Sequence, residues 1–126
     1  MFKMGVKDRC MISHSLGDPF FGPAAKMHGA TYEVEVIFHA KELDEHNIVF
    51  DIAKAQGALG EVMQRYNLKN LDDMDKLKGC VTTTEFMARL FHQELEELLE
   101  GRFRGELEVV VNESQVAYAS YRNALH

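Results

Sequence analysis

Apolar and polar residues alternate with a period of two in two stretches near the start of the chain. Within residues 2–14 the even positions are mostly apolar, and within residues 31–40 the alternation is regular. Four large side chains of the second stretch share one face: Tyr32, Val34, Val36 and Phe38. Because neighbouring side chains of a strand point to opposite faces, this pattern predicts two half-buried strands. The Gly- and Pro-rich residues 15–29 between them predict a long loop.

Two later stretches change to the helical period. After Asp51, apolar residues recur every three or four positions: Ile52, Ala55, Leu59, Val62, Met63 and Tyr66. A second stripe follows the sequence TTTE and consists of Phe86, Met87, Leu90, Phe91, Leu95, Leu98 and Leu99. Asp51 is a favourable N-cap residue, and Thr82 and Glu85 have the spacing of a capping box. We therefore predict two amphipathic helices, the second ending near Gly101.

The strand period returns in the last part of the chain. Leu107, Val109 and Val111 alternate with Glu106, Glu108 and Val110. The sequence NES at residues 112–114 is typical of a turn, and QVAYASY follows. The element order strand, strand, helix, helix, strand, strand predicts an α+β protein. We expect a four-stranded antiparallel sheet with two helices on one face, formed by residues 1–126 as a single domain. The two unpaired edges of such a sheet favour self-association.

The amino-acid composition excludes several classes of function. The 126 residues, 46% of them hydrophobic, suffice for one core. Twenty acidic against 14 basic residues leave a net charge of −6 and no basic stretch, which argues against nucleic-acid binding. No apolar run approaches the ~18 residues of a membrane span, and charges at positions 3, 7, 8 and 9 interrupt any signal-peptide core. We expect a cytoplasmic protein without membrane contact. Cys10 and Cys80 lack CxxC spacing, which predicts two buried free thiols.

Two histidines, His14 and His28, flank the predicted loop. If the first two strands pair antiparallel, both side chains lie at the same end of the hairpin and can converge on a metal ion. A catalytic zinc site normally uses three protein ligands and a water, so the pair is one ligand short. The alternative is that each is a polar loop residue or a histidine whose hydrogen bonds are satisfied within the fold. We expect the remaining histidines to be structural or solvated: His39, His46, His92 and His126.

Glu113 is in phase with the core face of a predicted strand. Counting back in steps of two reaches Val111, Val109 and Leu107. Because burial of an unpaired carboxylate is costly, either Glu113 has a cationic or multi-donor partner or the strand ends before it. A ligand with adjacent N–H donors, such as the guanidine-like edge of a heterocycle, would bind the carboxylate bidentately. A solvated turn glutamate is the alternative.

Six stretches follow one another over nearly the whole chain: SHSL, MHGATYEVEV, NIVFDIAKAQGAL, YNLKNLD, TTTEFMARLF and VVVNES. Together they resemble the 6-pyruvoyl- and 6-carboxy-tetrahydropterin synthases. The resemblance implies the tunnelling fold, in which strands of neighbouring subunits join into a barrel, as a trimer or commonly a hexamer of two trimers. It also implies a pterin-like ligand at a subunit interface, a lyase-type reaction and a zinc cofactor.

The resemblance assigns roles to particular residues. His14 and His28 correspond to two of the family's three zinc ligands, and Ala30 stands at the position of the third. The residues implied to bind the substrate are Thr83, Thr84 and Glu85 at the start of the second helix, and Glu113 as the anchor of the ring. With one imidazole missing, we expect zinc to bind weakly or not at all.

Two catalytic elements of the family are absent. The family's loop cysteine would fall near Ala24, yet no cysteine lies between residues 13 and 28, and Asn67 and Leu68 replace an Asp-His pair. Neither Asn67 nor Leu68 relays a proton as that pair does. The expected function is a homo-oligomeric lyase or isomerase acting on the side chain of a reduced pterin. The alternative is a non-catalytic pterin-binding or scaffold protein.

Overall fold

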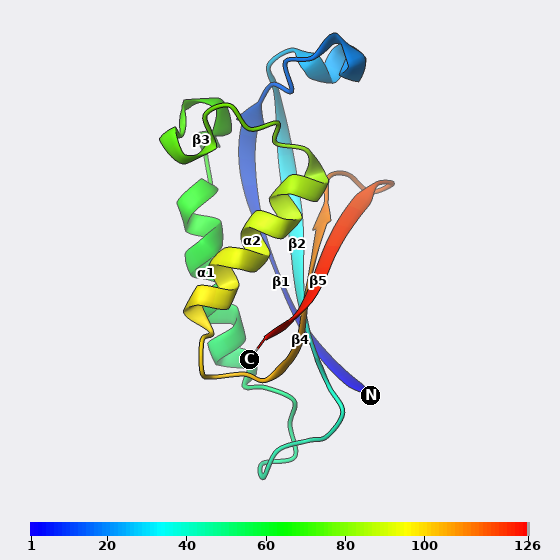
Figure 1. The fold of residues 1–126 in the computed structure, drawn as a ribbon, viewed down its shortest axis with the longest axis vertical. Coiled ribbons are helices and arrows are strands. Elements are labelled where there is room, and N and C mark those ends of the chain that lie inside the picture. Colours follow the sequence, from blue (N-terminus) through cyan, green and yellow to red (C-terminus); the bar gives the residue numbers. More distant parts are fainter. Residues whose placement is uncertain (126) are drawn as a thin grey trace.

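A computed structural model describes residues 1–125, which form a curved sheet with two helices on one face (Figure 1). Along the chain the elements are β1 (Phe2–His14), β2 (His28–Ala40), α1 (Ile52–Tyr66), β3 (Lys69–Asn70), α2 (Thr84–Leu98), β4 (Gly105–Asn112) and β5 (Tyr118–Leu125). Short 3-10 helices cover Pro19–Ala25, Leu71–Asp73 and Asp75–Leu77. His126, which we expected to be structural or solvated, lies outside the described residues.

The sheet has five strands in the order β3-β1-β2-β4-β5. The pairs β1–β2, β2–β4 and β4–β5 are antiparallel, whereas β3 is parallel to β1. The prediction of four antiparallel strands is therefore wrong, because the sheet has an additional strand, β3, that is parallel to its neighbour. A two-residue strand is too short to show a period of two. It is held instead by the backbone, where Leu68, at φ 61°, donates its N–H to the carbonyl of Met11 at 2.6 Å.

Both helices bury their predicted stripes against the sheet. The buried positions of α1 are Ala55, Leu59, Val62, Met63 and Tyr66, and those of α2 include Met87, Phe91 and Leu95. Only Ile52 of the first stripe is exposed, because it lies in the first turn, beyond the edge of the core. The face of β2 that carries Tyr32 and Phe38 is fully buried under the helices, as its alternation predicts.

The two cysteines differ in their environment. Cys10 lies in the core, where burial raises the pKa of its thiol to about 12, with a smaller contribution from the Asp8 charge. Cys80 is exposed, so the prediction of two buried thiols is wrong for this residue. It lies in the segment between the last 3-10 helix and α2. This segment has no regular alternation of apolar and polar residues, so the sequence does not indicate which of its side chains are buried.

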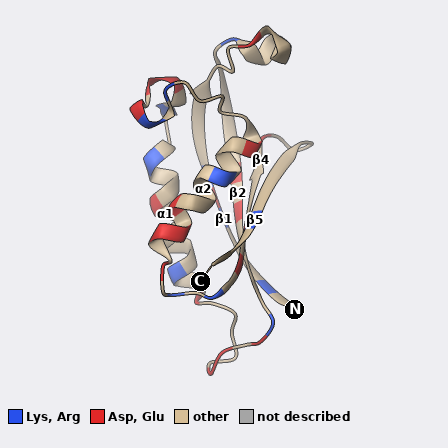
Figure 2. Cartoon of the chain, viewed as in Figure 1, with Lys and Arg blue, Asp and Glu red and all other residues tan. Residues whose placement is uncertain are grey.

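The surface of the helices carries both signs of charge. Figure 2 shows basic and acidic residues interspersed along α1 and α2 in this view. Within residues 1–125, neither helix has the length and apolar character required to cross a membrane.

Candidate functional site

His14 and His28 meet at one end of the sheet. His14 is the last residue of β1, His28 is the first of β2, and the strand register places them directly opposite each other. Their ring centroids are 4.6 Å apart in a T-shaped arrangement. Strand β2 begins three residues before the predicted start at Thr31, because backbone pairing continues through Gly29, where the alternation of side chains has stopped.

Each of these histidines has one ring nitrogen engaged. His14 Nδ1 lies 2.9 Å from Thr82 Oγ1, and His28 Nδ1 lies 2.8 Å from the carbonyl oxygen of Lys26. The other nitrogen of His14, Nε2, is buried and has no partner. Burial, assisted by His28, lowers the pKa of His14 despite the opposing charges of Asp72 and Glu113. The folded chain therefore favours a neutral His14 imidazole.

Among residues 1–125 of one chain, no third His, Cys, Asp or Glu side chain joins His14 and His28 as a zinc ligand. Ala30 lies opposite Ile12, and its methyl group offers no ligand atom. Among the described residues, the one group of three or more His, Cys, Asp or Glu side chains close enough to share a metal is Asp44, Glu45 and His46. These are exposed in the loop between β2 and α1, at the opposite end of the sheet (Figure 1). A catalytic zinc site normally uses three protein ligands, so weak zinc binding at His14 and His28 stays a prediction.

Tyr32 also lies at this end of the sheet. The sequence pattern predicted it only as a core residue. Its side chain is 0% exposed, and its hydroxyl has no hydrogen-bond partner. The ring lies 6.3 Å from that of His14 in a T-shaped arrangement. Burial and the charge of Glu113 raise the pKa of Tyr32, so the hydroxyl stays protonated. The feature of the sequence that could have identified Tyr32 is its position in the strand alternation, because Tyr32 lies on the same face of β2 as His28 and Ala30.

Glu113 lies one residue beyond the end of β4 and is exposed. Its backbone N–H donates to the carbonyl of Ala117 at 3.0 Å and begins the turn into β5. Of the interpretations left open by the sequence, the one in which the strand ends before Glu113 is correct, and burial in the core is wrong. The register of β2 with β4 ends at the pair of Glu33 and Asn112, and Glu113 follows directly after it. Besides burial, the charge of Glu113 acts on the pKa of both His14 and Tyr32. Glu113 lines a surface hollow of about 590 Å³ that also contains Glu33 and Glu35.

The start of α2 differs from the predicted capping box. The N-cap is Thr83, whose Oγ1 accepts a hydrogen bond from the backbone N–H of Phe86 at 3.1 Å. Thr82 is buried, and its hydroxyl contacts His14 instead. Glu85 is consequently the second residue of the helix and not the third, the position from which a capping-box glutamate reaches back. Sequence spacing did not show that a distant histidine would engage Thr82.

The substrate-binding residues implied by the resemblance lie in two separate hollows of one chain. Thr83 and Glu85 line a hollow of about 630 Å³ together with Phe21 and Arg89, whereas Glu113 lines the other. Thr84 is the first residue of α2 and is half-buried. The role of these residues in ligand binding stays a prediction.

Two polar residues near the site hold the backbone in place. Asn67 Oδ1 accepts a hydrogen bond from the N–H of Met11 at 2.9 Å and so fastens the end of α1 to β1. Asp72 accepts from both the backbone N–H and the hydroxyl of Ser15, at 3.0 and 2.5 Å. Because Ser15 directly follows His14, Asp72 fixes the point where the chain leaves the sheet.

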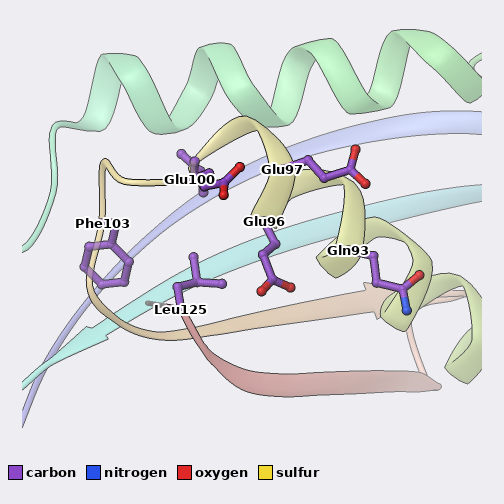
Figure 3. A pocket seen from close by; sticks show the side chains of 7 residues that line it. Gln93, Glu96, Glu97, Glu100, Phe103 and Leu125 are labelled. Carbon is purple, nitrogen blue, oxygen red and sulfur yellow. The ribbon is translucent and has the colours of Figure 1, made fainter.

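Another hollow lies at the far end of the molecule. It has a volume of about 490 Å³ and is lined by Gln93, Glu96, Glu97, Leu99, Glu100, Phe103 and Leu125 (Figure 3). Leu125 pairs with the first residue of β4, at the end of the sheet opposite Glu113. This hollow therefore contains none of the residues that the sequence assigned to a site.

Comparisons with known proteins agree with this fold. A model of the family 6-pyruvoyl tetrahydropterin synthase matches residues 3–124, whereas a search of curated proteins finds no match. Among solved structures, the chain is similar to 6-pyruvoyl tetrahydropterin synthase from Caenorhabditis elegans, with a TM-score of 0.85, 22% identity and coverage of 97% of this chain and 95% of the other.

Two further solved structures have the same fold. The Plasmodium falciparum 6-pyruvoyl tetrahydropterin synthase gives a TM-score of 0.81 at 14% identity, with 98% of both chains covered. An uncharacterized protein from Wolinella succinogenes gives 0.68 at 16% identity, with 97% of this chain and 98% of the other covered. At these identities the structures show the fold alone. The match of the family model over nearly the whole chain shows that this protein belongs to the 6-pyruvoyl tetrahydropterin synthase family.

Proposed function

We propose that this protein is a homo-oligomer that binds a pterin or a related bicyclic heterocycle and acts as a lyase or isomerase on the side chain of a reduced pterin. The observation that carries the proposal is that Glu113 follows β4 at the end of the sheet where His14, His28 and Tyr32 lie, and that its charge acts on the pKa of both His14 and Tyr32. A carboxylate for the ring and polar groups for its substituent thus lie at the same end of the sheet.

Glu113 suits the N–H edge of a pterin ring. A carboxylate accepts two parallel hydrogen bonds from adjacent N–H donors, and such charge-assisted pairs are strong and geometrically specific. Glu35, in the same hollow, is already engaged, because Asn112 Nδ2 donates to its Oε2 at 3.0 Å. Glu113 extends beyond the strand end and is exposed, so it is accessible to a ligand.

A second copy of the chain would complete the site. Within one chain, Glu113 and the pair Thr83 and Glu85 line different hollows. β5 is an edge strand with a single neighbour, and Phe20, in the loop beyond β1, is 86% exposed. Pairing at an open edge with another subunit covers unpaired backbone groups and would bring hollows of two subunits together.

The side-chain chemistry is carried by the residues that remain. A neutral imidazole can accept a proton as a general base, and burial favours the neutral form of His14 by lowering its pKa. His14 and His28 are the imidazoles beside the proposed position of the ligand side chain. No step is assigned to zinc, since the residues of one chain do not complete its site.

The alternative function is a non-catalytic pterin-binding or scaffold protein. Asn67, at the position of a family acid-base residue, is used to fasten β1. Ala30, at the position of a zinc ligand, packs against the core. Both positions thus serve the fold in this chain, which favours a protein that retains the pocket without the synthase chemistry.

Turnover and binding measured together separate these functions. We expect calorimetric titration to show binding of neopterin or biopterin. We expect conversion of 7,8-dihydroneopterin triphosphate to be slow with or without added zinc, because each missing acid-base group typically costs ~10²–10⁴-fold in rate. A rate equal to that of a family enzyme with the complete residue set would contradict this expectation. Binding without any turnover of reduced pterins would establish the scaffold function, and failure to bind any pterin would overturn the proposal.

A further inference from the structure

Two buried polar atoms at the proposed site, the hydroxyl of Tyr32 and Nε2 of His14, have no hydrogen-bond partner among residues 1–125. The side chains are 0% and 2% exposed. Folded proteins rarely leave such atoms without a partner, because their interactions with water are lost on burial and nothing replaces them. Tyr66 shows the usual arrangement, since it is equally buried and its hydroxyl donates to Glu94.

The two unpaired atoms belong to neighbouring side chains close to the surface. The rings of Tyr32 and His14 are 6.3 Å apart, and His14 also contacts His28, which is only half-buried. Across the sheet, Glu113 directly follows Asn112, which pairs with Glu33, the residue after Tyr32. The charge of Glu113 acts on the pKa of both Tyr32 and His14. A ligand ring held by Glu113 would therefore direct a substituent towards Tyr32 and His14.

We propose that Tyr32 is a ligand-binding residue whose hydroxyl donates a hydrogen bond to an oxygen on the side chain of the bound pterin, beside His14. This inference rests on the proposed function. A hydroxyl or keto oxygen accepts from Tyr32, and a hydroxyl group can also donate to His14 Nε2, so one oxygen-bearing substituent satisfies both buried atoms. Tyr32 would then favour pterins with an oxygenated side chain over unsubstituted pterin.

Titration of the purified protein with neopterin, which has a hydroxylated side chain, and with unsubstituted pterin tests this role. Tyr32→Phe removes the hydroxyl and keeps the ring. We expect neopterin to bind the variant roughly tenfold more weakly, the effect of about one hydrogen bond, and pterin to change by less than about twofold. The thermal midpoint should not fall, because the lost hydroxyl has no partner in the folded chain.

Tyr66→Phe is the matched control, since its hydroxyl is bonded to Glu94. It should lower the thermal midpoint and leave the ratio of neopterin to pterin affinities unchanged. If Tyr32→Phe weakens both ligands equally, weakens neither, or lowers the midpoint as Tyr66→Phe does, the inference is wrong while the proposed function stands. A parent protein that binds neither compound overturns the proposed function and this inference with it.

Discussion

Among single residues, Ala30 is the basis of the prediction that the two histidines bind a metal ion weakly. It lies on the same face of β2 as His28 but supplies no ligand atom. We predict that protein purified without added metal contains little zinc after dialysis against a chelator, because a site with two imidazoles binds zinc weakly. Elemental analysis measures this directly. One retained zinc per chain would show that another residue provides the third ligand.

The same prediction can be tested by adding the missing imidazole. Ala30→His should raise zinc affinity by at least ~100-fold, since even residues behind the ligands contribute ~10–100-fold. Thr31→His is the control, because Thr31 is exposed on the opposite face of β2. Competition with a chromogenic chelator compares the two variants. Equal affinities would mean that Ala30 does not adjoin a metal position.

Glu113 is the residue on which ligand binding depends most in the proposed function. Glu113→Gln keeps the shape but replaces one acceptor oxygen with a donor that opposes the N–H edge of the ring. Binding of neopterin should weaken by roughly 2–4 kcal/mol, about 30- to 1000-fold. Because Glu113 is exposed, the thermal midpoint should stay unchanged.

Glu33→Gln is the control for Glu113, since Glu33 lies in the same hollow one strand away. It changes the charge by the same amount and should have little effect on affinity. If both variants bind as tightly as the parent, Glu113 is a solvated turn residue and the pocket assignment is wrong.

At the scale of elements, Glu94 joins α2 to α1 and to the segment after it. It is 8% exposed and accepts hydrogen bonds from Tyr66, from Arg65 at 2.6 Å and from Lys76 at 3.1 Å. Burial alone would raise the pKa of Glu94, but these three donors outweigh burial and hold the pKa below 4.5. The ionised form is thus stabilised by folding.

This network predicts an acid-dependent loss of stability. A carboxyl whose pKa is lowered by folding stabilises the protein above its ordinary pKa, here near 4.5, and the contribution is lost as the pH falls through the folded value. Glu94→Gln should reduce the free energy of unfolding by about 2–3 kcal/mol at neutral pH. It should also flatten the decline of stability below pH 4.5.

Urea denaturation at several pH values measures both effects. Glu61→Gln is the control, because Glu61 forms only a 3.5 Å exposed pair with Arg65. Such pairs contribute less than about 1 kcal/mol. If the two variants behave alike, the three donors do not act on Glu94 as the geometry indicates.

At the scale of the whole molecule, the proposed site needs more than one chain. We predict that the protein is a homo-oligomer, a trimer or hexamer, because the residues implied to bind the ligand line two different hollows of one chain. Sedimentation or light scattering measures the size of the oligomer. Pterin affinity should therefore fall when dilution dissociates the oligomer. A monomer that binds neopterin with full affinity would contradict this prediction.

The sequence alone determined the main elements of this protein and their order. The boundaries of β1 and the buried stripes of both helices agree with the prediction, since the side-chain period of an element depends on its own residues. The convergence of His14 and His28 also followed, because a hairpin brings the two strand ends together.

Only the tertiary structure decided the surroundings of the site. The contact of Thr82 with His14, the unpaired hydroxyl of Tyr32 and the short strand β3 all depend on residues distant in the sequence. Glu113 has the phase of a core residue, yet it is exposed because the strand ends at Asn112 and turns back. Periodicity shows which face a side chain belongs to, but what lies against that face is determined by how the chain packs.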